Sequence, residues 1–272
     1  MLKKNILFLL IFAFSNVFGE GWTKKQGTGY YALDFRFLSA SKYHDSNGEN
    51  IEIEGVSDIA FNLYSEYGIT DNLTLRLNFP FYKILKNDDA GADNDNSGIG
   101  DIDFGLRYKL GQFGKTAFSA GINFGIPIST EDVYGKRELA LSDGEFNQIL
   151  SLEAGHSLYP LPAYISGSVK FNNRNEGYSD QFYIGAEGGY KFHKDFLLNL
   201  RFNFLKSLNK GNLEVLDNIL PIQANNQEYL ALRLGAFINF YRNYGIALTS
   251  DFGLYAKNVL SAPVFSVGFY IK

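Results

Sequence analysis

The sequence predicts an all-β fold, an antiparallel up-and-down transmembrane β-barrel of about twelve strands. Three observations support this prediction. Apolar and polar residues alternate over most of the chain. The alternating runs are mostly about 10–13 residues long, which exceeds the usual globular strand and suits a tilted strand crossing a bilayer. The connections between runs alternate between short and long, as they do in bacterial outer-membrane barrels.

The alternation is clearest near residue 75, where five large apolar residues share one face and three polar residues share the other: Leu73, Leu75, Leu77, Phe79 and Phe81 against Thr74, Arg76 and Asn78. A period of two is the signature of a strand with one apolar and one polar face. Runs of this kind predict strands at 28–40, 57–67, 73–86, 99–110, 116–128, 147–158, 163–173, 181–192, 196–206, 228–240, 245–256 and 262–271.

The connections indicate the topology. Short links are expected at 68–72, 111–114, 159–162, 193–195 and 241–244. Long polar links are expected at 41–56, 87–98, 129–146, 174–180 and 207–227, and a short link at 257–261 breaks the trend. Short turns belong on the periplasmic side and long loops outside the cell, so both chain ends should be periplasmic. The alternative is a soluble β-sandwich or lipocalin-like barrel with its apolar face inward. The Gly, Ser and Asn of the polar face argue against it.

Residues 1–19 resemble a secretory signal peptide that is cleaved near Gly19. Lys3 and Lys4 precede an apolar stretch too short to span a bilayer as a helix. We expect a short periplasmic segment at 20–27 and the barrel domain at 28–272, placed in the cell outer membrane. The net charge of −4 gives no reason to expect a nucleic-acid partner. The chain has no cysteine, which excludes disulfides and thiol chemistry.

Three stretches carry a family resemblance: 21–31, 64–74 with "EYGITDNLTL", and 98–110 with "GIGDIDFGLRYKL". They resemble outer-membrane barrels of the phenol meta-degradation-pathway transporter type, distantly related to long-chain fatty-acid channels. The resemblance implies passive passage of a small hydrophobic or aromatic solute. Outer-membrane lipid and the barrel-assembly machinery are the other expected partners. The chain ends on Lys272 rather than on the terminal aromatic residue common in such barrels. The alternative function is a structural or surface-binding barrel that acts through its long loops.

The polar face, projected inward, yields charges of both signs in near balance. A barrel of this size is wider than one that side chains fill completely. Two interpretations stay open: a structural salt-bridge network, or a selective constriction that contacts solute. The constriction candidates are Arg36, Arg76, Asp103, Arg107, Lys109, Glu153, Glu187, Arg201, Arg233 and Asp251.

An acidic stretch matches the first half of a calcium-binding loop, with oxygen ligands at alternate positions followed by Gly; the candidate ligands are Asp93, Asp95, Ser97 and Asp101. Phe104 stands where that motif requires a bidentate Glu, so a solvated acidic loop is the competing interpretation. No cofactor is expected. The three histidines, His44, His156 and His193, have no evident serine and carboxylate partners, so we do not expect an enzyme.

Overall fold

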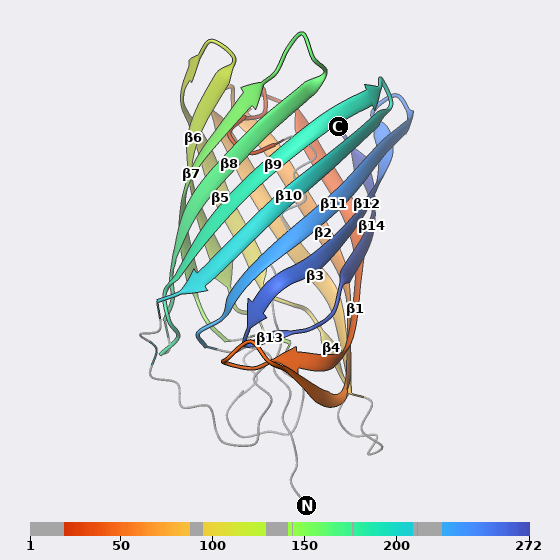
Figure 1. The fold of residues 1–272 in the computed structure, drawn as a ribbon. Helices are drawn as coiled ribbons and strands as arrows, with labels where there is room; N and C mark the ends of the chain where they lie inside the picture. Colours follow the sequence, from red (N-terminus) through yellow and green to blue (C-terminus); the bar gives the residue numbers. More distant parts are fainter. Residues whose placement is uncertain are drawn as a thin grey trace, which may run out of the picture.

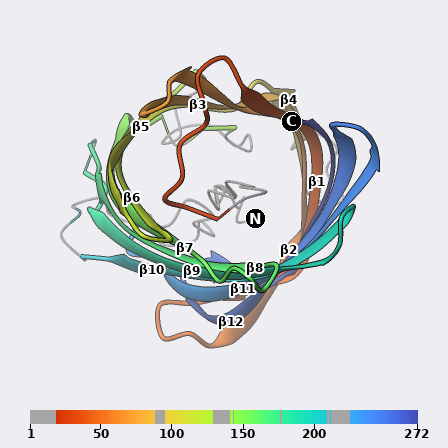
Figure 2. The same ribbon diagram turned by 90° about the horizontal axis from the view of Figure 1, so that it is seen from above.

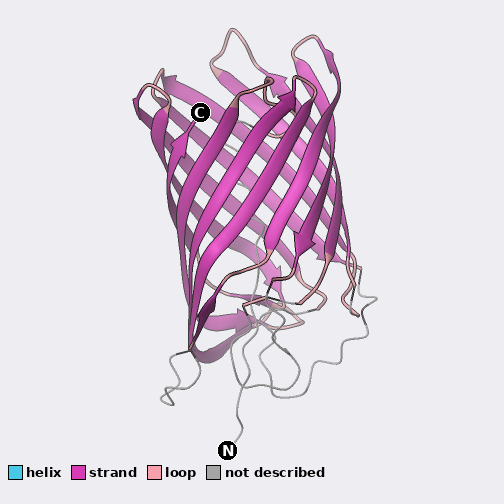
Figure 3. Cartoon of the chain, turned by 180° about the vertical axis from the view of Figure 1, so that it is seen from behind, coloured by secondary structure: helices cyan, strands magenta, loops and turns pink. Residues whose placement is uncertain are grey.

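The computed structural model describes residues 19–87, 95–128, 141–142, 144–175, 177–208, 211 and 225–272. These residues form a closed, antiparallel barrel of 12 strands, which confirms the predicted fold class (Figures 1 and 3). The barrel strands are β1 (Gly29–His44), β2 (Asn50–Thr70), β3 (Leu73–Asn87), β5 (Ile102–Phe113), β6 (Thr116–Ile126), β7 (Asn147–Ser157), β8 (Ala163–Asn173), β9 (Gln181–His193), β10 (Phe196–Ser207), β11 (Glu228–Tyr241), β12 (Tyr244–Lys257) and β14 (Val264–Ile271). Within the described residues, no helix combines the length and the apolar character needed to cross a membrane.

Closure of the barrel depends on β1, which pairs with β2 on one side and with β14 on the other. Leu33 lies opposite Leu63 of β2 and Phe269 of β14. Every other barrel strand pairs with its neighbours in chain order, as an up-and-down topology requires. The sheet therefore closes on itself, and this is the arrangement that satisfies backbone hydrogen bonds in lipid.

The two ends of the barrel differ, as Figure 1 shows. The five short turns, the start of β1 and the end of β14 lie at one end, which we call the turn end. The links 45–49 and 258–263 and the longer links lie at the other, the loop end. The alternation of short and long links predicted this arrangement, including the placement of both barrel termini at the turn end.

The predicted loop 41–56 was wrong. β1 continues to His44 and β2 starts at Asn50, and the link 45–49 is closed by Asp45, whose Oδ1 accepts the backbone N–H groups of Asn47 and Glu49 at 2.8 Å each. The sequence pattern failed because a register shift between Ala40 and Lys42 interrupts the alternation while the pairing continues beyond it.

Two further links contain short strands that the sequence did not predict. β4 (Asn96–Gly98) pairs with β3, and β13 (Val259–Leu260) pairs with the end of β1 opposite Tyr43 and His44. Most of the predicted long links 129–146 and 207–227 lie outside the described residues. Leu141 and Ser142 of the first are described, and both are buried.

The barrel wall presents large apolar side chains outward over its middle, among them Leu150, Leu200 and Leu234, with exposed fractions of 57%, 41% and 45%. Charged side chains of the same strands, such as Arg201 and Arg233, point inward and are buried. This confirms the predicted orientation of the two faces. An apolar exterior with a polar interior is stable in a bilayer and unfavourable in water.

Candidate functional site in the barrel lumen

The segment that precedes β1 lies inside the barrel. Figure 2 shows it passing from the turn end of β1 into the lumen. Its turn-end part is fastened to β2, because Gly27 N–H donates to Gly68 O and Gly68 N–H donates to Thr28 O, each at 2.9 Å. Its other end carries Glu20, which is 2% exposed. We call residues 19–28 the N-terminal strap. The sequence predicts a periplasmic segment at 20–27, whereas the structure places Glu20 within the lumen. Residues 1–18, which hold most of the expected signal peptide, lie outside the described residues.

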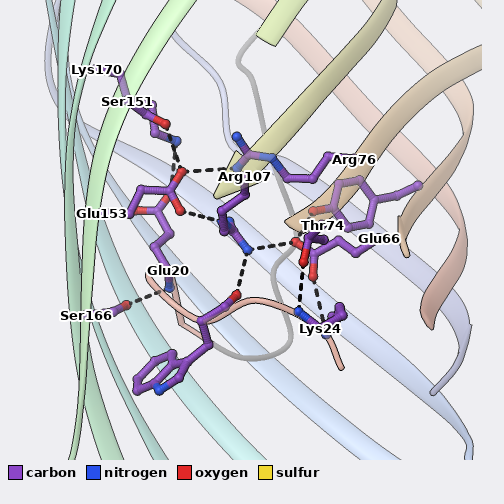
Figure 4. Close-up of polar contacts among 12 residues, drawn as sticks. Glu20, Lys24, Glu66, Thr74, Arg76, Arg107, Ser151, Glu153, Ser166 and Lys170 are labelled. Carbon is purple, nitrogen blue, oxygen red and sulfur yellow. Dashed lines mark hydrogen bonds and ion pairs between the residues drawn. The ribbon is translucent and has the colours of Figure 1, made fainter. Parts of the chain in front are cut away.

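A layer of buried ion pairs crosses the lumen, and Figure 4 shows the part of it around Arg107 and Glu153. We call it the central charged layer; it comprises Glu20, Lys24, Glu66, Arg76, Arg107, Glu153, Lys170, Glu187 and Arg201. Glu153 on β7 lies at its core, with its two oxygens 3.1 Å from Arg76 Nη1 and 2.7 Å from Arg107 Nε. Arg107 Nη1 is also 3.3 Å from Glu66 Oε1 on β2. The layer therefore links strands on different sides of the barrel through the lumen.

The N-terminal strap contributes directly to this layer. Glu20 Oε1 accepts from Lys170 Nζ at 2.9 Å and from Arg201 Nη2 at 2.8 Å. The Trp22 carbonyl accepts from Arg107 Nη1 at 3.1 Å, and Lys24 Nζ is 3.3 Å from Glu66 Oε2. The strap is thus held in the lumen by non-covalent polar contacts to several strands.

The structure gathers five of the ten constriction candidates into the central charged layer: Arg76, Arg107, Glu153, Glu187 and Arg201. The other five lie elsewhere. Arg36 pairs with Asp58 at 2.6 Å and Arg233 pairs with Asp251 at 2.8 Å, and each is a buried pair separate from that layer. Asp103 accepts from Asn78 at 3.0 Å, and Lys109 donates to Gln112 at 3.3 Å near a turn. The candidates do not form a single ring.

Sequence reasoning missed Glu20 and Lys24 as site residues. The strap has no strand periodicity, so the pattern that placed other charges in the lumen did not apply to it. One signal was present: a Trp and several charged residues stand together just before the first strand.

On the loop side of the central charged layer the lumen becomes apolar. Leu38, Val56, Leu85, Leu141 and Val264 belong to one buried cluster that joins β1, β2, β3 and β14 to the link before β7. Lys83 Nζ donates to the Leu141 carbonyl at 3.2 Å and so holds that link in place. Beside this cluster lies a cavity of about 200 Å³, whose wall is mostly apolar and includes His44, Tyr229, Asp251, Leu260 and Val264.

A larger cavity, of about 570 Å³, lies at the turn end and is lined partly by the strap. We call it the turn-end vestibule; its lining includes Trp22, Lys24, Lys25, Glu66, Tyr159, Leu161, Tyr164, Lys191 and Leu197. Lys272, the residue after β14, lies close to Lys24 and Lys191 of this lining. Burial and the neighbouring ammonium groups of Lys191 and Lys24 lower the pKa of Lys272 to about 8. Positive charge is therefore concentrated at this end of the lumen.

The predicted cation ligands are only partly described. Asp93 lies outside the described residues; Ser97 lies in β4, and Asp101 is buried just before β5. Among the residues that the structure describes, no three His, Cys, Asp or Glu side chains group closely enough to hold a metal ion. The cation site stays a prediction.

The three histidines lie on three different strands, β1, β7 and β9. His156 Nδ1 is 2.8 Å from Thr116 Oγ1 on the outward face of β7. His44 Nδ1 contacts the Gly48 carbonyl at the loop end, and His193 lies 3.5 Å from Asp195 in an exposed turn.

Comparison with known proteins addresses the fold. No protein-family model and no curated protein matches the sequence. Among solved structures, an outer membrane channel from Pseudomonas putida F1 superposes with a TM-score of 0.70 at 14% identity, covering 92% of this chain and 97% of that chain. The NanC porin superposes with a TM-score of 0.53 at 8% identity, covering 88% and 99%. The fold is that of an outer-membrane β-barrel. The translocator domain of the autotransporter NalP from Neisseria meningitidis also superposes at 0.53, with 10% identity over 91% of this chain and 89% of that chain, so the fold serves different activities.

Proposed function

We propose that this protein is an outer-membrane channel for small apolar or aromatic molecules, which cross by passive diffusion. The observation that carries the proposal is the arrangement of the lumen: a mostly apolar cavity toward the loop end and a larger vestibule at the turn end lie on opposite sides of the central charged layer. A barrel that served only as a scaffold would have no need of chambers at both ends.

The strap is the part of the central charged layer whose displacement opens a path. The other members of the layer project from hydrogen-bonded strands, whereas the part of the strap around Glu20 and Trp22 is held by side-chain and carbonyl contacts. The apolar lining at the loop end favours an uncharged or weakly polar solute at entry, because burying a charge there without a partner is costly. The solved structure named above as an outer membrane channel has the same fold, and that is consistent with this role.

The proposal is tested by reconstituting the refolded protein in liposomes and measuring influx of a small neutral aromatic alcohol. Wild type should exceed protein-free liposomes. Glu20→Ala, which removes the contacts to Lys170 and Arg201, should raise influx further by releasing the strap. Glu52→Ala, at an exposed position on β2, serves as the matched control and should behave as wild type.

If neither wild type nor Glu20→Ala passes solute while both are folded, the channel proposal fails. A structural or surface-binding role carried by the long loops then becomes the better hypothesis.

A further inference from the structure

The turn-end vestibule has an unbalanced charge. Lys24, Lys25 and Lys191 line it, and Glu66 is the one carboxylate among its described lining residues. That carboxylate is already engaged, since Arg107 and Lys24 both lie within 3.3 Å of it and Tyr64 OH donates to it at 2.8 Å. Lys191, at the end of β9, is exposed. The vestibule therefore presents net positive charge to whatever enters it.

The same vestibule has aromatic walls. Trp22 and Tyr164 meet edge to face, with ring centroids 5.9 Å apart and planes at 90°. Tyr159, Leu161 and Leu197 add further apolar surface to the lining. Its volume of about 570 Å³ lies within the usual range for small-molecule sites. Flat apolar walls next to ammonium groups match a guest that has an aromatic ring at one end and a negative charge at the other.

We propose that the turn-end vestibule is a binding site for small aromatic anions of the aryl carboxylate class. The ring lies against Trp22 and Tyr159, and the carboxylate is held by Lys191 and Lys25. This inference rests on the proposed function in that the vestibule is the periplasmic mouth of the same lumen; an anion reaches it from that side without crossing the apolar loop-side lining.

The crowding of positive charge supports this assignment. Lys24, Lys25 and Lys191 line one cavity. Burial is the main cause of the lowered pKa of the neighbouring Lys272, and the ammonium groups of Lys191 and Lys24 lower it further. A bound anion offsets this positive charge, whereas a bound cation adds to it. Two guests of the same shape and opposite charge should thus differ strongly in affinity.

The chain carries its own reporter for the test, because Trp22 is its single tryptophan and lines the vestibule. The refolded full-length protein in detergent micelles is titrated with benzoate, with its neutral counterpart benzamide and with benzylammonium, while Trp22 fluorescence is recorded. We expect a saturable change with benzoate, at least about fivefold weaker binding of benzamide, and no saturable change with benzylammonium.

Single substitutions test which lysines hold the carboxylate of benzoate. Lys191→Gln and Lys25→Gln should each weaken benzoate binding by about threefold to tenfold, as expected for partly exposed ion pairs. Lys194→Gln is the matched control, because Lys194 lies in the same turn as the end of β9 but not in the vestibule lining, and it should leave affinity unchanged. Lys25 and Lys191 lie on separate segments of the chain. If one of the two variants fails to fold, the benzoate affinity of the other variant still tests the proposal.

Equal binding of benzoate and benzamide overturns the proposal, and so does unchanged benzoate affinity in the variants that fold. The titration in micelles requires no transport. Benzoate binding without flux through liposomes therefore contradicts the channel, whereas flux without charge-selective binding contradicts only the anion site.

Discussion

Strand β1 passes through two environments, and its two faces exchange character between residues 34–37 and residues 38–43. In its turn-side half, Phe35 and Phe37 point outward and are exposed, while Arg36 points inward and is buried against Asp58. In its loop-side half, Leu38 and Tyr43 point inward and are buried, whereas the outward positions carry Ser39 and Lys42. The first half has the pattern of a membrane barrel, and the second that of a soluble one.

Each face of the strand therefore has the polarity of the medium that it contacts. Neighbouring strands change at the same level: Ser39 lies opposite Ser57 of β2, and Ser57 lies opposite Lys86 of β3. A row of two serines and a lysine is unfavourable in hydrocarbon and ordinary in water. We infer that the apolar band ends near this row and that the loop-side ends of β1–β3 project beyond the bilayer, enclosing the apolar part of the lumen.

The largest expected effect concerns which end of the barrel faces outward. Because the chain has no cysteine, a single introduced cysteine is a unique label site. Asn47→Cys, in the link at the loop end, should react fully with a bulky membrane-impermeant maleimide on intact cells. Lys194→Cys, at the turn end, should react only after the outer membrane is permeabilised. The reverse pattern would invert the topology and exchange the roles of the two cavities.

The next largest effect lies in the central charged layer. Glu153→Ala leaves the guanidinium groups of Arg76 and Arg107 without their shared carboxylate, and all three side chains are at most 2% exposed. Removing one partner of a buried ion pair lowers the free energy of unfolding by about 3–5 kcal/mol, because the remaining charge is left buried without compensation. The free energy of unfolding, measured by urea titration in lipid vesicles, should fall by this amount. Glu153→Gln, which keeps the shape, should lose less. A loss below about 1 kcal/mol would mean that the layer is hydrated and structurally unimportant.

The contrast along β1 also explains how far the sequence could predict this protein. Period-two alternation is local, so it located strands well: the run expected at 163–173 is β8 as observed. It failed near residues 41–56, because there the faces exchange polarity and a register shift breaks the alternation. Period-two alternation assigns one polarity to each face along a whole strand, and β1 and β2 depart from this rule toward the loop end.

The central charged layer was only partly predictable for a different reason. Inward-facing charges such as Glu153 and Arg107 follow from strand alternation. The contact between Glu20 and Lys170 joins residues 150 positions apart through a segment without periodicity, and no local pattern encodes it. The turn-end vestibule likewise combines the strap with the ends of several strands, so its lysines could not be grouped before the fold was known.

A pair of outward-facing substitutions on β1 tests where the bilayer ends. Phe35→Arg places a charge in the apolar band and removes a ring contact with Phe61 at a centroid distance of 5.3 Å. It should lower the free energy of unfolding in vesicles by about 2–4 kcal/mol. Ser39→Arg, four residues later on the same face, should change it by less than about 0.5 kcal/mol. Both are measured by urea unfolding in lipid vesicles. Equal losses would place Ser39 within the hydrocarbon and contradict the exchange of faces.

The smallest effect concerns the pair Lys42–Glu52, which joins β1 and β2 beyond the inferred edge of the bilayer. Its atoms are 3.3 Å apart, about the same as in the ion pairs of the central charged layer, but its side chains are 51% and 77% exposed. Water screens such a pair, so Glu52→Gln should cost no more than about 0.5 kcal/mol, and the loss should vanish at high salt. Urea unfolding in vesicles at low and at high salt measures this. The same comparison for Glu153→Gln should depend far less on salt, because buried charges are poorly screened. If Glu52→Gln instead caused a large loss that salt does not reduce, the pair would be shielded from water, and the loop-side end of β1 would lie within the membrane or beneath a loop.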